Sequence, residues 1–191
     1  MSNYKVTIGL SNKHLHLSAA HIEALFGAGH KLTPTKDLRQ PGQFACEEKV
    51  DLEGPKGVLK GLRVLGPARP KTQIELSLTD ARGLGIKAPV RESGKLDGSP
   101  GCRLTGPGGS VELDCGVIVA LRHVHLSPAE ALDAGVKDKD VIRVRVGDER
   151  AVVFENVLVR AGDAHLSEFH LDTDEGNAAG VDSGQEAELL L

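Results

Sequence analysis

The sequence predicts a mainly β protein in which small β-barrel domains carry short capped helices. The 191-residue chain is 40% hydrophobic but only 3% aromatic, and its 23 glycines and 9 prolines supply many turns between aliphatic strands. Hairpin signals recur along the chain, and a strand that runs directly into a short helix occurs once in each half. These three observations together are typical of a barrel-rich protein and argue against a fibrous or disordered chain.

The clearest element is an internal repeat. SNKHLHLSAAHIEALFGAG in the first half recurs as ALRHVHLSPAEALDAGV in the second half. In the first copy we expect Ser18 to cap a short helix that ends at Gly27. In the second copy we expect Ser127 and Glu130 to form a capping box, with Gly135 as the stop. Each copy is therefore predicted to be a strand with a His-x-His unit followed by a capped helix.

The remaining segments predict further strands. Gly and Pro indicate hairpin turns around residues 54–57 and 106–109, and VIRVRV-GDER-AVVFENVLV predicts a late strand pair. A weaker repeat pairs residues 64–86 with residues 157–181, and it aligns Glu75 with His170. Beyond that point the alignment includes a one-residue slip. Both members are predicted to be a strand, a turn and a short helix.

Charge and cysteine usage exclude several classes of protein. The net charge is −4, and the 23 basic and 27 acidic residues are interspersed without a basic run, which argues against a nucleic-acid or anionic-membrane surface. Three widely spaced cysteines form neither a disulfide framework nor a zinc ribbon, and they fit a reducing compartment. No secretory signal and no run of about 20 apolar residues is present. We therefore expect a cytoplasmic protein.

The His-x-His units carry the strongest chemical signal. Residues i and i+2 of a strand point to the same face, so each unit presents two imidazoles side by side, half of a tetrahedral zinc site. The alternative is a set of ordinary polar residues on strands, which the duplication disfavours. Three protein ligands at each site would leave a position open for substrate or water, as in catalytic sites. The two predicted ligand sets are His14, His16 and Glu75, and His123, His125 and His170.

Other residues are candidates for supporting roles. Arg69 lies in GPARPKT, six residues before Glu75, where it could hold an anionic substrate next to the first metal; a surface arginine is the alternative. Cys46-Glu47-Glu48 is a second candidate ligand cluster, although a buried cysteine beside charged residues is the interpretation we favour. Ligand-supporting contacts are expected from three neighbours of the ligands, Ser77, Arg122 and Asp172. The other histidines, His21, His30 and His165, are expected to be solvated or supporting.

Seven motifs in a fixed order extend this picture. They are SNKHLHLS, LTPTKDLRQPGQFACEE, RVLGPARPKTQIELS, PVRESG, GSPGC, RHVHLSP and FHLDTDEGNAA. Taken together they resemble the propanediol-utilisation (PduL-type) phosphotransacylases, also called phosphate propanoyltransferases, over nearly the whole chain. Such a set is far more specific than a single His-x-His.

The resemblance implies an activity and a set of partners. These enzymes interconvert acyl-coenzyme A and phosphate with acyl phosphate and coenzyme A, and they hold two zinc ions between two small β-barrel domains. Carried onto this sequence, the zinc ligands coincide with the two sets above, and the phosphate-binding arginine is Arg69. Other divalent transition metals could occupy such ligands. The coenzyme A contacts fall on Leu10, Ser11, Asn12, Lys56, Arg63 and Asn177.

The resemblance also implies an organisation. One barrel would combine residues 1–12 with residues 121–191, and the other would use residues 13–120. A small homo-oligomer, a dimer, is expected. Members packaged in microcompartments often carry an amphipathic extension before the first strand, and here only a few residues precede Tyr4. We therefore expect a freely cytoplasmic enzyme.

Two other functions compete with a transacylase. A dinuclear zinc hydrolase of a thioester or phosphoester could use the same ligands to generate hydroxide, and it would turn over acyl-coenzyme A without phosphate. A non-catalytic metal-binding module would enclose its metals fully in protein ligands, whereas the sequence offers three clear ligands at each site.

Overall fold

A computed structural model describes residues 4–191 of the chain. Residues 1–3 lie outside the described part. The expectation about an N-terminal extension concerns these residues and so also lies outside it. The chain forms two compact units, one from the residues up to Asn12 together with Leu121–Leu191, and one from Lys13–Ala120. Within residues 4–191, no helix is long and apolar enough to cross a membrane.

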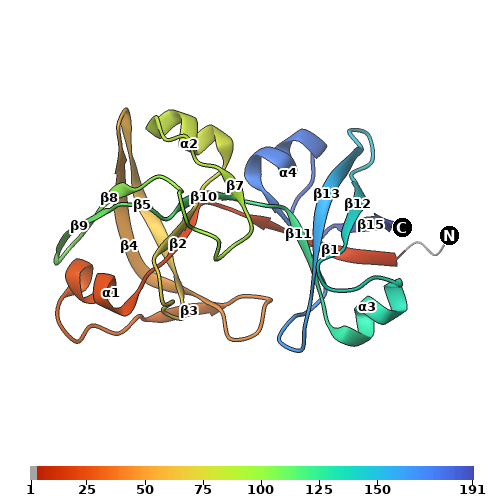
Figure 1. Cartoon of the computed structure of the whole chain (residues 1–191), viewed down its shortest axis with the longest axis horizontal. Coiled ribbons are helices and arrows are strands. Elements are labelled where there is room, and N and C mark those ends of the chain that lie inside the picture. The colour runs from red at the N-terminus through yellow and green to blue at the C-terminus, as the bar shows by residue number, and fades with distance from the viewer. Residues whose placement is uncertain (1–3) are drawn as a thin grey trace. The chain divides into compact units, whose positions relative to one another are not determined.

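The first unit is a closed six-stranded barrel. Its strands follow the order β1, β14, β11, β13, β12 and β15, and β15 pairs with β1 to close it (Figure 1). The β1–β14 and β11–β13 pairs are parallel and the other pairs are antiparallel. The elements are β1 (Tyr4–Ser11), β11 (His123–Leu126), α3 (Pro128–Ala134), β12 (Val141–Val146), β13 (Val152–Ala161), β14 (Glu168–Asp172), α4 (Thr173–Ala179) and β15 (Glu186–Leu190).

The second unit is a curled sheet of nine strands. The order is β7, β10, β6, β2, β5, β4, β8 and β9, with β3 paired to β4 (Figure 1). Among residues 4–191, β7 pairs only with β10 and β9 only with β8, so the sheet stays open and the unit forms half of a barrel wall. The elements are β2 (His14–His16), α1 (Ala19–Phe26), β3 (Pro34–Asp37), β4 (Phe44–Gly54), β5 (Gly57–Gly66), β6 (Gln73–Glu75), α2 (Leu78–Leu84), β7 (Val90–Arg91), β8 (Cys102–Gly106), β9 (Gly109–Leu113) and β10 (Val117–Ala120).

The mainly β class with short helices is confirmed, and so are the predicted hairpins. Gly54 pairs with Gly57 at the turn between β4 and β5, and Gly106 pairs with Gly109 at the turn between β8 and β9. The late strand pair is β12 with β13. The β-barrel expected for residues 13–120 takes the form of a curled half-barrel sheet, because a hydrophobic pattern fixes which face of a strand is buried but not whether the edge strands meet.

The two helices of the repeat begin and end as predicted. The Ser18 hydroxyl accepts a hydrogen bond from the His21 N–H at the start of α1, and Gly27 ends that helix. Ser127 and Glu130 form the expected reciprocal capping box on α3. A cap of this kind is worth about 1 kcal/mol and fixes where the helix starts. Each His-x-His strand is therefore joined to its helix by one rigid corner.

The weaker repeat is more regular than the sequence alignment suggested. Ser77 caps α2 and Asp172 caps α4, and each cap lies two residues after Glu75 or His170. Both helices have seven residues and end at a left-handed glycine. The two segments therefore align without a one-residue slip. The helix caps define this common register, which residue identities alone did not reveal.

Each unit has its own apolar core under the strands that carry the histidines. Ile8, Val124 and Phe169 are almost fully buried in the barrel, and Leu15 and Ile74 are fully buried under the sheet. Burying a side chain of this size stabilises the fold by about 1.5–3 kcal/mol. β2 lies between β5 and β6, and β11 lies between β13 and β14, so both His-x-His strands are held on two sides.

Candidate metal centres and active site

The first histidine cluster is built by strands β2 and β6 of the sheet. Their antiparallel register places His14 opposite Glu75 and His16 opposite Gln73. His14 Nε2 lies 3.6 Å from Glu75 Oε2, and the rings of His14 and His16 meet edge to face with centroids 5.4 Å apart. One ligand atom from each of His14, His16 and Glu75 lies within 4.8 Å of the other two. The three side chains predicted as one ligand set are therefore brought together.

The second cluster repeats this arrangement in the barrel. The β11–β14 register places His123 opposite His170 and His125 opposite Glu168, and the three histidines again offer ligand atoms within 4.8 Å of one another. His123 Nδ1 donates to the Leu121 carbonyl at 2.8 Å, so its Nε2 carries the lone pair. That atom lies 3.1 Å from His125 Nε2, so it accepts the Nε2–H of His125 and leaves the lone pair of His125 on Nδ1.

The electrostatics of both clusters fit a transition metal. His16 Nδ1 and His125 Nδ1 occupy equivalent positions, are buried, and have no hydrogen-bond partner within residues 4–191. Such an atom costs about 1–3 kcal/mol unless something binds it. Burial, reinforced by the Arg69 charge, lowers the pKa of His16 to about 3, and burial also lowers the pKa of His125. Both imidazoles are therefore neutral at pH 7, which is the form that ligates metals.

Arg69 lies beside the first cluster. Its backbone N–H donates to the carbonyl of Leu17 at 2.9 Å, which ties its loop to the end of the His-x-His strand. Its Nη1 donates to Ser93 Oγ at 3.2 Å, and its charge is close enough to lower the pKa of His16. A guanidinium held next to a candidate metal can bind an anion bidentately.

The residues expected to contact coenzyme A fall into two groups, one in each unit. Leu10 and Ser11 end β1, Asn12 follows them, and Asn177 lies on α4. Helix α4 packs closely on this strand end, because a Cβ at Gly176 would lie 2.6 Å from Leu10 Cδ2. The structure therefore brings the four residues of the barrel to one strand end and the helix that covers it.

The other two expected contacts are separated. Lys56 lies in the β4–β5 turn, where its side chain packs against Gly85 at the end of α2. Arg63 lies on β5 next to His14 of the first cluster, and its Nη1 donates to the Cys46 carbonyl at 2.7 Å. Seven residues of extended strand place them roughly 20 Å apart. Only Arg63 of the pair adjoins the histidine cluster.

Several candidate supporting residues have structural roles instead. The Ser77 hydroxyl caps α2 and the Asp172 carboxylate caps α4. Arg122 donates to Glu175 Oε1 at 2.6 Å in the first turn of α4. A serine or aspartate two residues after a ligand is drawn to the free N–H groups of the helix that begins there.

The alternative Cys46-Glu47-Glu48 cluster is a packing feature. Cys46 is fully buried, and burial raises the pKa of its thiol to about 11. Glu48 accepts hydrogen bonds from His30 Nε2 at 2.8 Å and from the N–H and hydroxyl of Thr33. These bonds fasten the segment after α1 to β4.

Three polar residues close to the clusters were missed by sequence reasoning. Gln73 and Ser93 hydrogen-bond Glu75, and Glu168 hydrogen-bonds His170. Gln73 and Glu168 each precede a candidate ligand by two residues, so strand periodicity was a usable signal for both. Ser93 lies in the PVRESG motif but is distant in sequence from Glu75, and only the fold brings it there.

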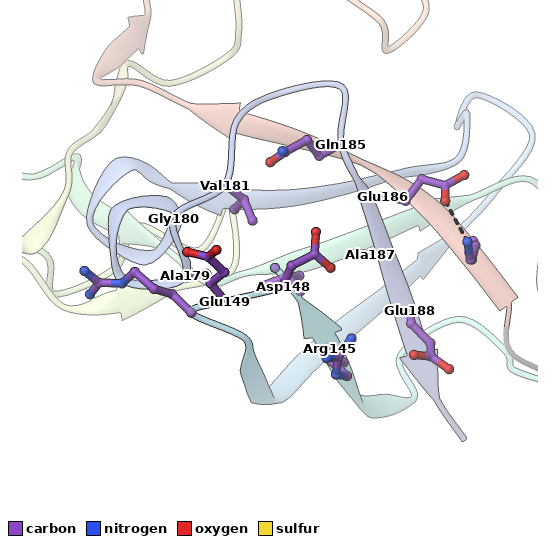
Figure 2. A pocket seen from close by; sticks show the side chains of 14 residues that line it. Arg145, Asp148, Glu149, Ala179, Gly180, Val181, Gln185, Glu186, Ala187 and Glu188 are labelled. Carbon is purple, nitrogen blue, oxygen red and sulfur yellow. Dashed lines mark hydrogen bonds and ion pairs between the residues drawn. The ribbon is translucent and has the colours of Figure 1, made fainter.

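A hollow of about 560 Å³ on the barrel is separate from this chemistry. Charged side chains of both signs line it, including Arg145, Asp148 and Glu149 (Figure 2). The exposed pair of Lys5 and Glu186 spans one wall at 2.8 Å. None of the candidate ligands, Arg69 or the expected coenzyme A contacts lines it. The two histidine clusters are therefore the better candidates for the reacting centre.

Fold and site define a mainly β protein with two matching clusters of three candidate metal ligands, one of them beside an arginine. Comparison with known proteins gives its family: the family model described as phosphate propanoyltransferase matches residues 7–182. The chain therefore belongs to the phosphate propanoyltransferase family, a family of transferases.

Curated relatives agree over most of their length. A phosphate propanoyltransferase of Thermotoga maritima is 49% identical over 94% of this chain and 86% of its own length. That of Sebaldella termitidis is 51% identical over 91% of this chain and 82% of its own length. That of Salmonella typhimurium is 50% identical over 96% of this chain and 87% of its own length.

Proposed function

We propose that this enzyme transfers an acyl group between coenzyme A and inorganic phosphate, and that it does so with two bound zinc ions. Propanoyl-coenzyme A and acetyl-coenzyme A are the proposed acyl donors. The name shared by the family and by the relatives supports the reaction class. The observation that carries the zinc proposal is the pair of buried, partnerless Nδ1 atoms at equivalent positions of the two clusters.

The first cluster, His14, His16 and Glu75, would hold one zinc ion, and the second, His123, His125 and His170, would hold the other. When bound, zinc at such sites supplies Lewis acidity toward a carbonyl or phosphate oxygen and stabilises a thiolate. Three protein ligands at each cluster leave a position for substrate. Nitrogen and carboxylate donors of this kind suit zinc, cobalt and nickel, so the proposal of zinc rests on its usual tetrahedral chemistry.

Arg69 would bind the phosphate dianion. Its backbone N–H donates to the Leu17 carbonyl, and its guanidinium donates to Ser93 Oγ. A fixed fork of donors holds phosphate in one orientation, so that one oxygen can attack the thioester carbonyl carbon. A carbon–oxygen bond then forms, the carbon–sulfur bond breaks, and coenzyme A leaves as its thiolate. Phosphate is itself the nucleophile, so the reaction needs no acylated side chain.

The coenzyme A contacts remain part of the proposal. Leu10, Ser11, Asn12 and Asn177 would contribute from the barrel, and Lys56 and Arg63 from the sheet. We propose the two compact units as the two domains of the enzyme, and a homodimer as its assembly in the cytoplasm. Cationic side chains such as Lys56 suit the phosphates of coenzyme A.

The experiment is release of free thiol from propanoyl- and acetyl-coenzyme A by the zinc-loaded protein, with and without phosphate and before and after chelation. The proposal expects release that requires both phosphate and metal. Release in the absence of phosphate would identify a hydrolase instead. No release with either donor would contradict the proposed acyl transfer.

Arg69→Ala and Arg69→Lys separate phosphate binding from metal binding. On the order of a 100-fold loss in kcat/KM for phosphate is expected for the alanine variant, as for removal of one fixed donor in other enzymes. The lysine variant keeps the charge but loses the fork, and an intermediate loss is expected. Zinc content should stay at the wild-type value in both, and a parallel loss of zinc would contradict this division of roles.

A further inference from the structure

We propose that Gln73 and Glu168 are positioning residues that hold the third ligand of each metal cluster. The inference rests on the metal binding proposed above and adds a fourth residue to each cluster. Gln73 acts on Glu75 in the sheet, and Glu168 acts on His170 in the barrel. Neither is counted among the ligands.

Strand register places the two residues at equivalent positions. Gln73 lies opposite His16 across the β2–β6 pair, and Glu168 lies opposite His125 across the β11–β14 pair. Each therefore shares a strand face with its own ligand two residues later, and lies across from the second histidine of its unit. Both are buried, Gln73 to 1% exposure and Glu168 to 9%. Each cluster therefore consists of three candidate ligands and one hydrogen-bonding side chain, Gln73 or Glu168, which we call the corner residue.

The Gln73 amide is oriented by its own contacts. Its Oε1 accepts the backbone N–H of Gly94 at 2.7 Å, which turns its NH₂ group toward the cluster. That group donates to Glu75 Oε1 at 2.5 Å and to Ser93 Oγ at 2.7 Å. One carboxylate oxygen of Glu75 is thereby fixed, and the other, Oε2, is the atom that faces His14 Nε2. A carboxylate held in this way presents a single oxygen to a metal.

Glu168 performs the same task with the opposite polarity. Its Oε2 lies 2.7 Å from His170 Nε2, so the carboxylate accepts that N–H and leaves Nδ1 of His170 with the lone pair. A carboxylate that accepts from a ligating histidine fixes its tautomer and raises its basicity. Gly9 on the neighbouring strand makes the necessary room, because a Cβ there would lie 2.6 Å from Glu168 Oε1.

The donor and the acceptor are exchanged together between the two clusters. Where the third ligand is a carboxylate, the corner residue is an amide that donates. Where the third ligand is an imidazole, the corner residue is a carboxylate that accepts. Each cluster also holds one negative charge, from Glu75 in the sheet and from Glu168 in the barrel. This matching of chemistry to the ligand would not be expected if the two corners only filled space.

Metal affinity, measured one site at a time, tests the proposal. In the His16→Ala background the barrel cluster is the one with all its ligands, so Glu168→Ala and Glu168→Gln can be compared there by competition with a chromogenic zinc chelator. In the His125→Ala background Gln73→Ala is compared in the same way. We expect each alanine substitution to weaken zinc binding 10- to 100-fold. Glu168→Gln should lose less, since its amide oxygen can still accept from His170.

Glu48→Gln is the matched control, because Glu48 is a buried glutamate that bonds a histidine at 2.8 Å away from both clusters. It should lower stability without changing zinc affinity. Gly9→Ala should weaken zinc binding in the barrel alone, through the displaced Glu168. Unchanged zinc affinity in Glu168→Ala and Gln73→Ala would overturn this inference and leave the proposed function standing. Absence of zinc binding by the wild-type protein would overturn both.

Discussion

Removal of metal should destabilise the protein by an amount that the two clusters set. Two buried Nδ1 atoms, one on His16 and one on His125, lack a partner within residues 4–191. Each represents about 1–3 kcal/mol of unsatisfied polar burial in the metal-free protein. Zinc at 100 times its dissociation constant adds about 2.7 kcal/mol for each site, because it binds the folded state and not the unfolded one.

This free energy converts to a measurable shift. In a chain of about 200 residues, 1 kcal/mol moves the melting temperature by roughly 2–4 °C, so each occupied site should add roughly 5–10 °C. The perturbation is His16→Ala, which removes one ligand of the sheet cluster. We expect the bound zinc to fall from two ions to one, and the part of the zinc-dependent stabilisation that belongs to the sheet to disappear.

The assay is differential scanning calorimetry with metal analysis, on wild type and His16→Ala, each with chelator and with zinc. His21→Ala is a suitable control, because His21 lies on the neighbouring helix α1 and bonds Thr72 instead of the cluster. A wild-type protein whose melting is unaffected by zinc would refute the reasoning. So would His16→Ala binding two zinc ions with the full stabilisation.

Three further predictions concern substrate, protons and packing. Arg69→Ala should lower kcat/KM for phosphate by about 100-fold while zinc content, measured by metal analysis, stays unchanged. In the metal-free protein, chemical denaturation should show that the free energy of unfolding falls as pH drops below 6.5. His16 takes up a proton in the unfolded chain at these pH values, but it stays neutral in the folded protein, where its pKa is about 3. His16 alone should cost about 2 kcal/mol by pH 5, and His16→Gln should flatten the slope, whereas an unchanged slope would count against a buried neutral imidazole. Gly101→Ala should unfold the sheet unit or destabilise it by several kcal/mol, since its Cβ would lie 1.6 Å from the Leu113 carbonyl oxygen. Gly83→Ala, in open space on α2, should instead stabilise the protein by about 0.5–1 kcal/mol. Thermal melts that rank the two variants the other way would contradict the packing.

Short sequence patterns predicted much of the secondary structure. Ser18 and Ser127 predicted where two helices begin, because a capping hydroxyl acts on N–H groups only a few residues away. The His-x-His spacing likewise predicted two imidazoles on one strand face, as found for His14 with His16. The metal role of these residues stays a prediction.

Non-local features were harder to predict. The openness of the second sheet depends on edge strands that fail to meet, and no local pattern encodes that. Strand periodicity placed Gln73 and Glu168 on the same face as a candidate ligand, but only the register shows that they lie opposite the second histidines. We expected Ser77 to support a ligand because of its place near the strand, but its hydroxyl accepts a hydrogen bond from the Asp80 N–H at the start of α2. The free N–H groups of a nearby helix end therefore predict the hydrogen-bond partner of such a side chain better than its closeness in sequence to a ligand.

The most direct test of the proposed chemistry follows the acyl group itself. The zinc-loaded protein is mixed with propanoyl-coenzyme A and phosphate, and acyl phosphate is trapped with hydroxylamine while free thiol is measured in parallel. An acyl transferase predicts one acyl hydroxamate for each thiol released, with both lost on chelation. Thiol release accompanied by free propanoate and no trapped acyl phosphate would contradict the account.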